Sequence, residues 1–181
     1  MDSKKLTVRD LCAIAMFTAL ISVSAQLAIP MPYGVPMTLQ TLAIPLAGIV
    51  LGAKKGTVAT LVYIALGAVG APVFSSFRSG LSVIIGPTGG FIYTFPLMTL
   101  AAGLGERANN KPALFVGLIV GAVINYLGGM LHYSVVMSVS IPSAFTVSVL
   151  PFLPTGVIKI ILAAFLGRSI KYALVKSRVL T

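Results

Sequence analysis

The sequence predicts an all-α integral membrane protein, a single domain over residues 1–181 with six transmembrane helices and both termini in the cytoplasm. The first observation is composition: 57% of the residues are hydrophobic, 9% are charged and the mean hydropathy is +1.04, whereas a soluble domain carries about 25% charged residues. The second is a series of six apolar runs. The third is the distribution of basic residues, which cluster in alternate gaps between those runs.

The apolar runs cover residues 11–29, 38–53, 57–71, 88–104, 112–133 and about 155–172, each bounded by proline, glycine or charge. A helix needs about 20 apolar residues to cross the hydrocarbon core of a bilayer. Since the second and third runs are shorter than this, we expect them to be tilted neighbours beneath polar loops. Short spans leave room for a cavity.

Basic residues indicate the orientation. Apart from Arg78 and Lys159, all of them fall on one side when six spans are threaded, and the positive-inside rule makes that side cytoplasmic. The outward segments are then residues 30–37, 73–87 and 134–154. In the last of these we expect a short interfacial or re-entrant helix, with Pro154 near the first turn of the last span, where a missing N–H costs nothing.

The longest polar interruption, residues 73–90, predicts a lid or binding loop at the membrane surface. Serines surround the lone Arg78, and a glycine-rich run follows. Glycine lets backbone approach a ligand closely. The candidate contacts in that run are Gly86, Thr88 and Gly89.

Lys159 is the only charge in the interior of a predicted span, since Arg168 and Lys171 fall at the cytoplasmic end of the last run. An intramembrane charge is costly and marks a functional site by default, although a lysine near a helix end also snorkels to the interface. No acidic residue in the spans can pair with it, and Arg78 lies at the same outer mouth. Two cations without carboxylates suit an anionic solute.

Other polar or small residues in the spans have two interpretations each. Gln40, Asn125 and Tyr126 either bridge helices or contact a polar solute in a cavity. Ala15 and Ala19, one helical turn apart, either pack inside the bundle or present a flat face to a second membrane protein. The sequence favours neither alternative for the alanines.

Several activities are disfavoured. The only acids are Asp2, Asp10 and Glu106, at the cytoplasmic edge, so no carboxylate relay crosses the membrane. Residues 52–57, GAKKGT, resemble a nucleotide-binding loop only in composition and predict a cytoplasmic turn. One cysteine and one histidine give no metal site, and no pair of titratable groups suggests an enzyme. The scattered basic clusters do not suggest nucleic acid. Transport is therefore passive or powered from elsewhere.

Five segments form a recognisable set: VPMTLQTL (35–42), LAGIVLG (46–52), LGAVGAPVF (66–74), GPTGGF (86–91) and PFLP (151–154) with Lys159. Together they resemble the BioY family, the membrane-embedded substrate-binding S components of biotin energy-coupling-factor (ECF) transporters. The resemblance implies a prokaryotic plasma membrane protein with six helices, cytoplasmic termini and a biotin site under the outward loops. We expect its ligand-binding residues to be Thr38, Gln40, Arg78, Gly86, Thr88, Gly89, Asn125, Tyr126, Thr155 and Lys159.

The resemblance also implies partners. The alanine pair on the first span is the family's docking face for a transmembrane coupling subunit, and Ala15 and Ala19 match it. Two ATPase subunits would bind the ATP, so this chain needs no cofactor of its own.

One position departs from the family pattern. Members typically carry an acidic residue in a Pro-Gly-Asp-type run before the lysine, and here Gly156 stands in its place. Such a carboxylate would accept from the ureido N–H groups of biotin, a role left to Thr155, Asn125 or Gln40. The alternatives are a BioY-like importer of a related small anion, such as a biotin precursor, and a membrane scaffold with no solute site.

Overall fold

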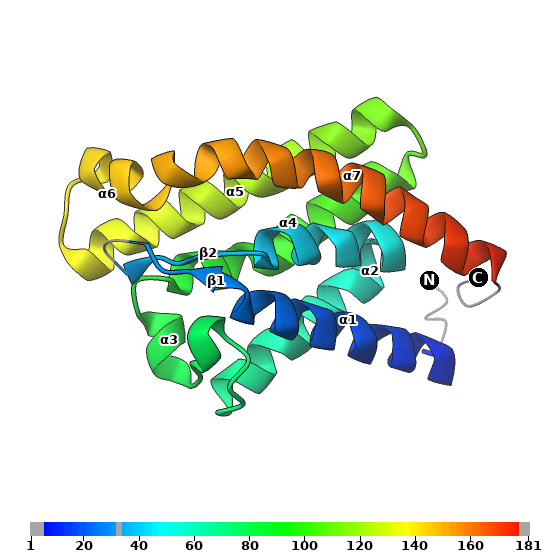
Figure 1. Cartoon of the computed structure of the whole chain (residues 1–181), viewed down its shortest axis with the longest axis horizontal. Helices are drawn as coiled ribbons and strands as arrows, with labels where there is room; N and C mark the ends of the chain where they lie inside the picture. Colours follow the sequence, from blue (N-terminus) through cyan, green and yellow to red (C-terminus); the bar gives the residue numbers. More distant parts are fainter. Residues whose placement is uncertain (1–5, 32–33, 178–181) are drawn as a thin grey trace, which may run out of the picture.

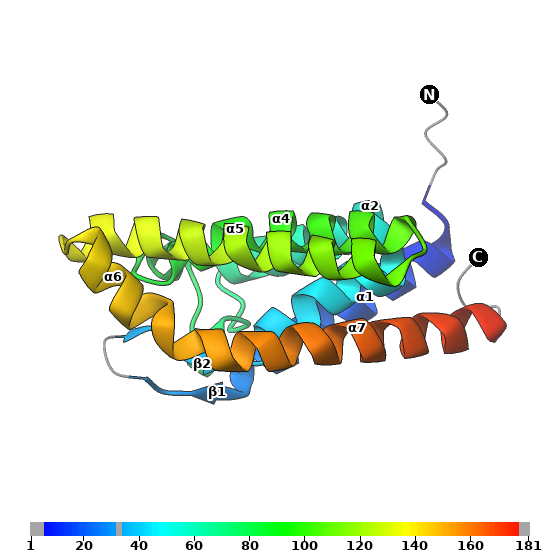
Figure 2. The ribbon, with the colours of Figure 1, turned by 90° about the horizontal axis from the view of Figure 1, so that it is seen from above.

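The long helices run roughly along the long axis of an elongated bundle (Figure 1), and a two-stranded antiparallel sheet lies at one flank (Figure 2). The computed structural model describes residues 6–31 and 34–177. Lys4, Lys5 and Arg178, which contribute to the predicted orientation, and the acidic Asp2 lie outside these ranges. The elements in chain order are α1 (Val8–Gln26), β1 (Ala28–Ile29), β2 (Met37–Thr38), α2 (Gln40–Ala68), the 3-10 turn η2 (Ser75–Phe77), α3 (Leu81–Ile85), α4 (Gly89–Arg107), α5 (Lys111–Met137), α6 (Ile141–Ser148), the 3-10 turn η3 (Leu150–Phe152) and α7 (Leu153–Lys176).

Local sequence signals set the helix ends. Thr7 and Asp10 form a capping box at the start of α1, in which each side chain accepts a hydrogen bond from the other residue's backbone N–H. Asn110 caps α5 by accepting from the backbone N–H of Ala113 at 2.7 Å. Pro154 lies in the first turn of α7, and α6 is the short helix expected before it.

α2 joins the second and third predicted spans. Gly52 breaks it, with φ +80° and ψ 166°, a conformation that a residue with a Cβ rarely adopts. The predicted turn over residues 52–57 is wrong in extent, because this single glycine makes the break and residues 53–57 are already helical. The two halves therefore change direction without an intervening loop.

The helices form two layers, seen best from above (Figure 2). α4 packs between α2 and α5 in one layer, and α7 lies along α2 in the other. The contact of α2 with α4 is so close that a Cβ on Gly48 would lie 2.2 Å from the carbonyl oxygen of Thr99. At the same interface the buried hydroxyls of Thr60 and Thr99 are hydrogen-bonded at 2.8 Å. Small residues here permit close packing, as in other membrane helix pairs.

By length and composition, four stretches of the described chain can cross a membrane: Val8–Gln26, Gln40–Ala68, Lys111–Met137 and Ile141–Lys176. This confirms the all-helical, multi-pass membrane class. The count of six spans and the side on which the termini lie stay predictions. Ala15 and Ala19 are both exposed on α1, whose opposite face packs against α2, so the alanine pair does not serve internal packing.

Candidate functional site

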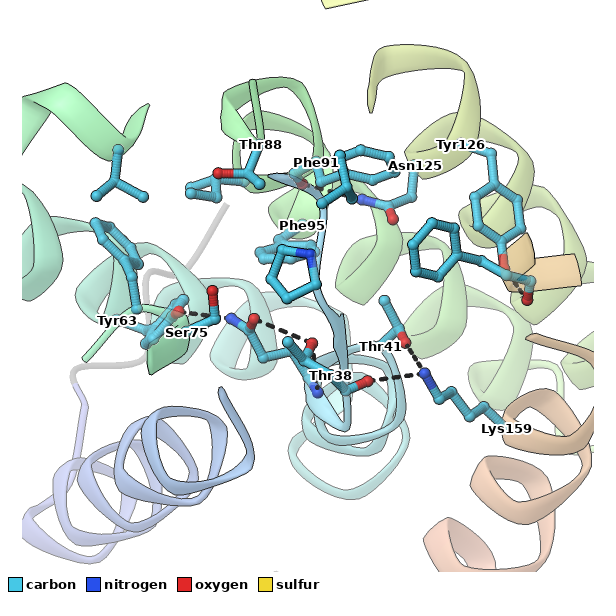
Figure 3. A pocket seen from close by; sticks show the side chains of 17 residues that line it. Thr38, Thr41, Tyr63, Ser75, Thr88, Phe91, Phe95, Asn125, Tyr126 and Lys159 are labelled. Atoms are coloured by element: carbon cyan, nitrogen blue, oxygen red, sulfur yellow. Dashed lines mark hydrogen bonds between the residues drawn. The ribbon is translucent and has the colours of Figure 1, made fainter. Parts of the chain in front are cut away.

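A cavity of about 650 Å³, its open mouth included, lies between α2, α4, α5 and α7, with β2 and η2 at its sides (Figure 3). Most of its wall is apolar, and a few polar groups converge on it, which is the usual constitution of a small-molecule site. The lining residues are Val35, Pro36, Thr38, Gln40, Thr41, Tyr63, Phe74, Ser75, Val83, Thr88, Phe91, Ile92, Phe95, Asn125, Tyr126, Phe152 and Lys159.

Lys159 is the one ionised side chain in this lining. It extends from α7, half-buried, and its Nζ donates to the carbonyl oxygen of Thr38 at 2.7 Å and to Oγ1 of Thr41 at 2.9 Å (Figure 3). Within the described ranges no carboxylate lies at ion-pairing distance from it. Both partners are neutral, so the positive charge is solvated but not neutralised, and an anion in the cavity would gain from it.

Asn125 of α5 provides an acceptor. Its side chain is buried, and Nδ2 donates to the carbonyl oxygen of Phe91 at 3.0 Å and to Oγ1 of Thr94 at 2.9 Å. With both amide protons used on α4, the side-chain oxygen faces the cavity (Figure 3). Asn125 can therefore accept a hydrogen bond from a ligand N–H.

Gln40 differs from Asn125 because both the nitrogen and the oxygen of its side-chain amide are hydrogen-bonded within the protein. Its Nε2 donates to the hydroxyl of buried Tyr63 at 2.5 Å, and its Oε1 accepts from Oγ1 of Thr38 at 3.2 Å. Gln40 and Tyr63 lie in opposite halves of α2, so this pair joins the halves across the Gly52 break. Sequence reasoning found Thr38 and Gln40 as polar groups in an apolar run but missed Tyr63.

Aromatic side chains make up much of the wall, and sequence reasoning missed them as a group. An aromatic residue in an apolar run carries no signal that separates cavity lining from core. The side chains come from α2, the residue before η2, α4 and η3, and they are Tyr63, Phe74, Phe91, Phe95 and Phe152.

The η2 turn is held in place by Gln26 at the end of α1. The Gln26 amide donates to the carbonyl oxygens of Val73 and Phe74 at 3.2 and 3.1 Å, and its Oε1 accepts from the backbone N–H of Phe77 at 2.8 Å. The turn needs this support because Ser76 and Phe77 both have positive φ, 58° and 56°. Gln26 thus positions pocket-lining Phe74 and its neighbour Ser75.

Arg78 does not line the cavity. It is exposed, and its guanidinium donates to the carbonyl oxygen and to Oγ of Ser75, both at 3.2 Å. The side chain therefore turns back onto its own loop at the edge of the pocket, while Ser75 lines the wall. Of the predicted contacts in the following glycine-rich run, Thr88 lines the cavity.

The other three predicted contacts lie outside the lining for packing reasons. The carbonyl oxygen of Gly86 is 3.0 Å from Nε2 of His132 and ties the loop to α5. Gly89 is buried at the start of α4, where a Cβ would lie 1.8 Å from the carbonyl oxygen of Ile84. The glycine there serves helix packing rather than close approach of a ligand. Thr155 donates its hydroxyl to the carbonyl oxygen of Phe152 at 3.1 Å.

Comparison with known proteins identifies the family of the chain. The model of the BioY family matches residues 1–176. The chain belongs to the BioY family. A probable biotin transporter BioY of Pyrococcus horikoshii is 36% identical over 163 residues, 90% of this chain and 96% of that protein. A biotin transporter BioY of Thermotoga maritima is 36% identical over 164 residues, with coverage of 90% and 96%.

A solved structure agrees with the family assignment. The crystal structure of the S-component for biotin from an ECF-type ABC transporter superposes with a TM-score of 0.85 and 25% identity, covering 95% of each chain. The BioY family and this fold are transporter components, not enzymes.

Gly156, near which the resemblance led us to expect an acidic residue, lies in a closely packed place. A Cβ on Gly156 would lie 2.3 Å from the hydroxyl oxygen of Tyr126. That hydroxyl donates to the carbonyl oxygen of Phe152 at 3.2 Å. Tyr126 therefore occupies the space that any side chain at position 156 would enter, and the acid cannot be restored without moving it.

Proposed function

We propose that the chain is the biotin-binding S component of an ECF-type importer, capturing biotin at the outer face of the membrane for ATP-driven delivery. The observation that carries the proposal is the cavity itself, in which an unneutralised lysine, an amide oxygen and aromatic walls converge in a BioY chain. The relatives named as biotin transporters and the biotin S-component structure support it.

The parts of the cavity match the parts of biotin. The aromatic walls suit the bicyclic ring and its aliphatic chain, which gain by leaving water. Asn125 can accept from a ureido N–H, and Thr88 and Tyr126 are hydroxyl neighbours in the same lining. Lys159 can pair with the carboxylate in a charge-assisted hydrogen bond. Arg78, at the exposed edge, is the other candidate cation, and Lys159 is favoured because it lines the cavity.

The first experiment is equilibrium binding of labelled biotin to the purified protein. Saturable one-site binding is expected, and Lys159→Gln should weaken it about 10- to 100-fold, since a hydrogen bond to a charged group contributes about 1.5–3 kcal/mol. Lys54→Gln is the matched control, because Lys54 is exposed and lies outside the lining.

The methyl ester of biotin separates the two cations. If Lys159 binds the carboxylate, Lys159→Gln should affect biotin much more than the ester, and Arg78→Gln should affect both ligands alike. The reverse pattern would assign the carboxylate to Arg78. Unchanged biotin affinity in both variants would remove the carboxylate assignment altogether.

A related small anion is the second candidate ligand, favoured by the missing acid at Gly156. Competition with biotin precursors and other carboxylated analogues separates it from biotin, because the true ligand should displace the label at the lowest concentration. A scaffold without a solute site predicts no saturable binding of any of them.

For the partners, we propose that exposed Ala15 and Ala19 dock the transmembrane coupling subunit, which works with two ATPase subunits in the plasma membrane of a prokaryote. Ala15→Trp and Ala19→Trp should then abolish co-purification with the coupling subunit and leave biotin affinity unchanged. Val123→Trp, at an exposed position of α5, is the control for added bulk. Retained co-purification in both alanine variants would move the docking face elsewhere.

A further inference from the structure

A second hollow lies at the other end of the bundle, between the start of α5 and the second half of α7. It measures about 480 Å³, its open side included. Buried Leu114 and Ala164 form its floor, and Phe165, which is 69% exposed, stands at its rim. The lining residues are Lys111, Leu114, Phe115, Ala164, Phe165, Arg168 and Ser169.

The hollow carries an excess of positive charge. Glu106 is buried beside it and pairs with Nε of Arg168 at 2.9 Å and with Nζ of Lys171 at 3.0 Å. This one carboxylate faces three cations, because exposed Lys111 lines the same hollow and pairs with no carboxylate of the described residues. The backbone carbonyl oxygen of Asn110 accepts a hydrogen bond from Nη2 of Arg168 at 3.1 Å. The guanidinium has five N–H donors in all. Donors therefore remain for an anion.

The arrangement is amphipathic in a way that limits the occupant. Two cations lie in a groove whose other walls are leucine, alanine and phenylalanine, with Ser169 as the one further polar residue, between two stretches long and apolar enough to span a membrane. A soluble anion would use the cations and leave the apolar walls uncovered. A neutral lipid would cover the walls and leave the cations without a counter-charge. One molecule with a phosphate and acyl chains satisfies both parts.

We propose that this groove binds an anionic phospholipid, with its phosphate between Lys111 and Arg168 and an acyl chain over Phe115 and Phe165. Basic pockets between membrane helices are suited to anionic lipid headgroups. The start of α5 adds the positive end of its helix dipole to the same place. The groove shares no lining residue with the biotin cavity, so the inference stands independently of the proposed function.

The test is lipid retention by the full-length protein, measured by native mass spectrometry. The protein in detergent is titrated with phosphatidylglycerol or phosphatidylcholine of identical acyl chains. Wild type should retain phosphatidylglycerol preferentially, and Lys111→Gln should lower that preference about fivefold, the effect of one basic residue near an anionic headgroup. Ser169→Trp, which fills the groove from an exposed position, should lower retention of both lipids. Lys54→Gln should behave as wild type.

A soluble probe separates a lipid from a free anion. Glycerol phosphate, which has the phosphate and no acyl chains, should not displace phosphatidylglycerol. If it does so at equal concentration, the groove binds a small anion and the proposal is wrong. It is equally wrong if wild type shows no lipid preference, or if Lys111→Gln and Ser169→Trp both retain the wild-type pattern. Gel filtration and thermal unfolding check that each variant is folded.

Discussion

Gly156 and Tyr126 allow a quantitative test of how the pocket end of α7 is packed. In Gly156→Ala the new Cβ would begin 2.3 Å from the Tyr126 hydroxyl oxygen, so the ring must move and its 3.2 Å hydrogen bond to Phe152 must lengthen. Overpacking costs about 1–3 kcal/mol, and the lost hydrogen bond costs about 1 kcal/mol. Replacing glycine by alanine in a helix returns up to about 1 kcal/mol. We expect Gly156→Ala to be destabilised by about 1–3 kcal/mol.

Removing the hydroxyl should relieve the clash. In Tyr126→Phe the nearest remaining atom is Cζ, 3.4 Å from the Cβ position, which is an ordinary contact. The carbonyl oxygen of Phe152 keeps its bond from Thr155 at 3.1 Å, so Tyr126→Phe alone should cost about 1 kcal/mol or less. The double variant should therefore be close to wild type.

The assay is thermal unfolding of the four proteins in one detergent. About 1 kcal/mol shifts Tm by about 2–4 °C for a chain of this size, so Gly156→Ala should melt about 2–12 °C below wild type and the double variant within about 2 °C of it. The reasoning is refuted if Gly156→Ala melts with wild type, or if the two substitutions simply add.

Three further substitutions test the packing around the site. Gly48→Ala should be the most damaging, with a loss of about 3 kcal/mol or failure to fold, because its Cβ would meet backbone, the carbonyl oxygen of Thr99 at 2.2 Å; a Tm near wild type would contradict the close contact of α2 with α4. Gln26→Ala should speed hydrogen exchange in residues 73–78 and weaken biotin binding, and unchanged exchange there would show that the turn needs no clamp. Glu106→Gln should lower the free energy of unfolding by about 1–3 kcal/mol, because it removes the buried carboxylate that forms two ion pairs. Thermal unfolding measures this loss, and a stability equal to wild type would mean that the two pairs contribute nothing.

The sequence predicted the elements better than their junctions. The runs at 88–104 and 112–133 became α4 and α5 with shifts of a few residues, because long apolar runs with clear caps leave little choice. α2 was harder. A glycine at positive φ and a loop of several residues look alike in sequence, and the outcome depends on whether α4 packs against both halves.

For the candidate site, burial of polar groups was the useful signal. Asn125 and Lys159 stand out because a polar group in an apolar run needs a reason. Arg78 was expected in the pocket, but its direction is decided by local hydrogen bonds to Ser75 that no pattern reveals. Gly89 lies outside the lining, and the sequence could not indicate this, since a glycine that admits a ligand and a glycine that admits close packing have the same sequence signature.

The ion pairs of the described residues are unevenly distributed, and this divides the molecule mechanically. Asp10 pairs with Lys55, and Glu106 pairs with Arg168 and Lys171, and none of these residues lines the cavity. The cavity end is closed by neutral acceptors around Lys159 and by single hydrogen bonds such as that of Tyr126. Helices anchored by charge at one end can splay at the other while every ion pair stays intact. Opening and closing over a solute then requires exchanging hydrogen bonds of about 1–3 kcal/mol each, with no ion pair broken, and the fold itself need not loosen.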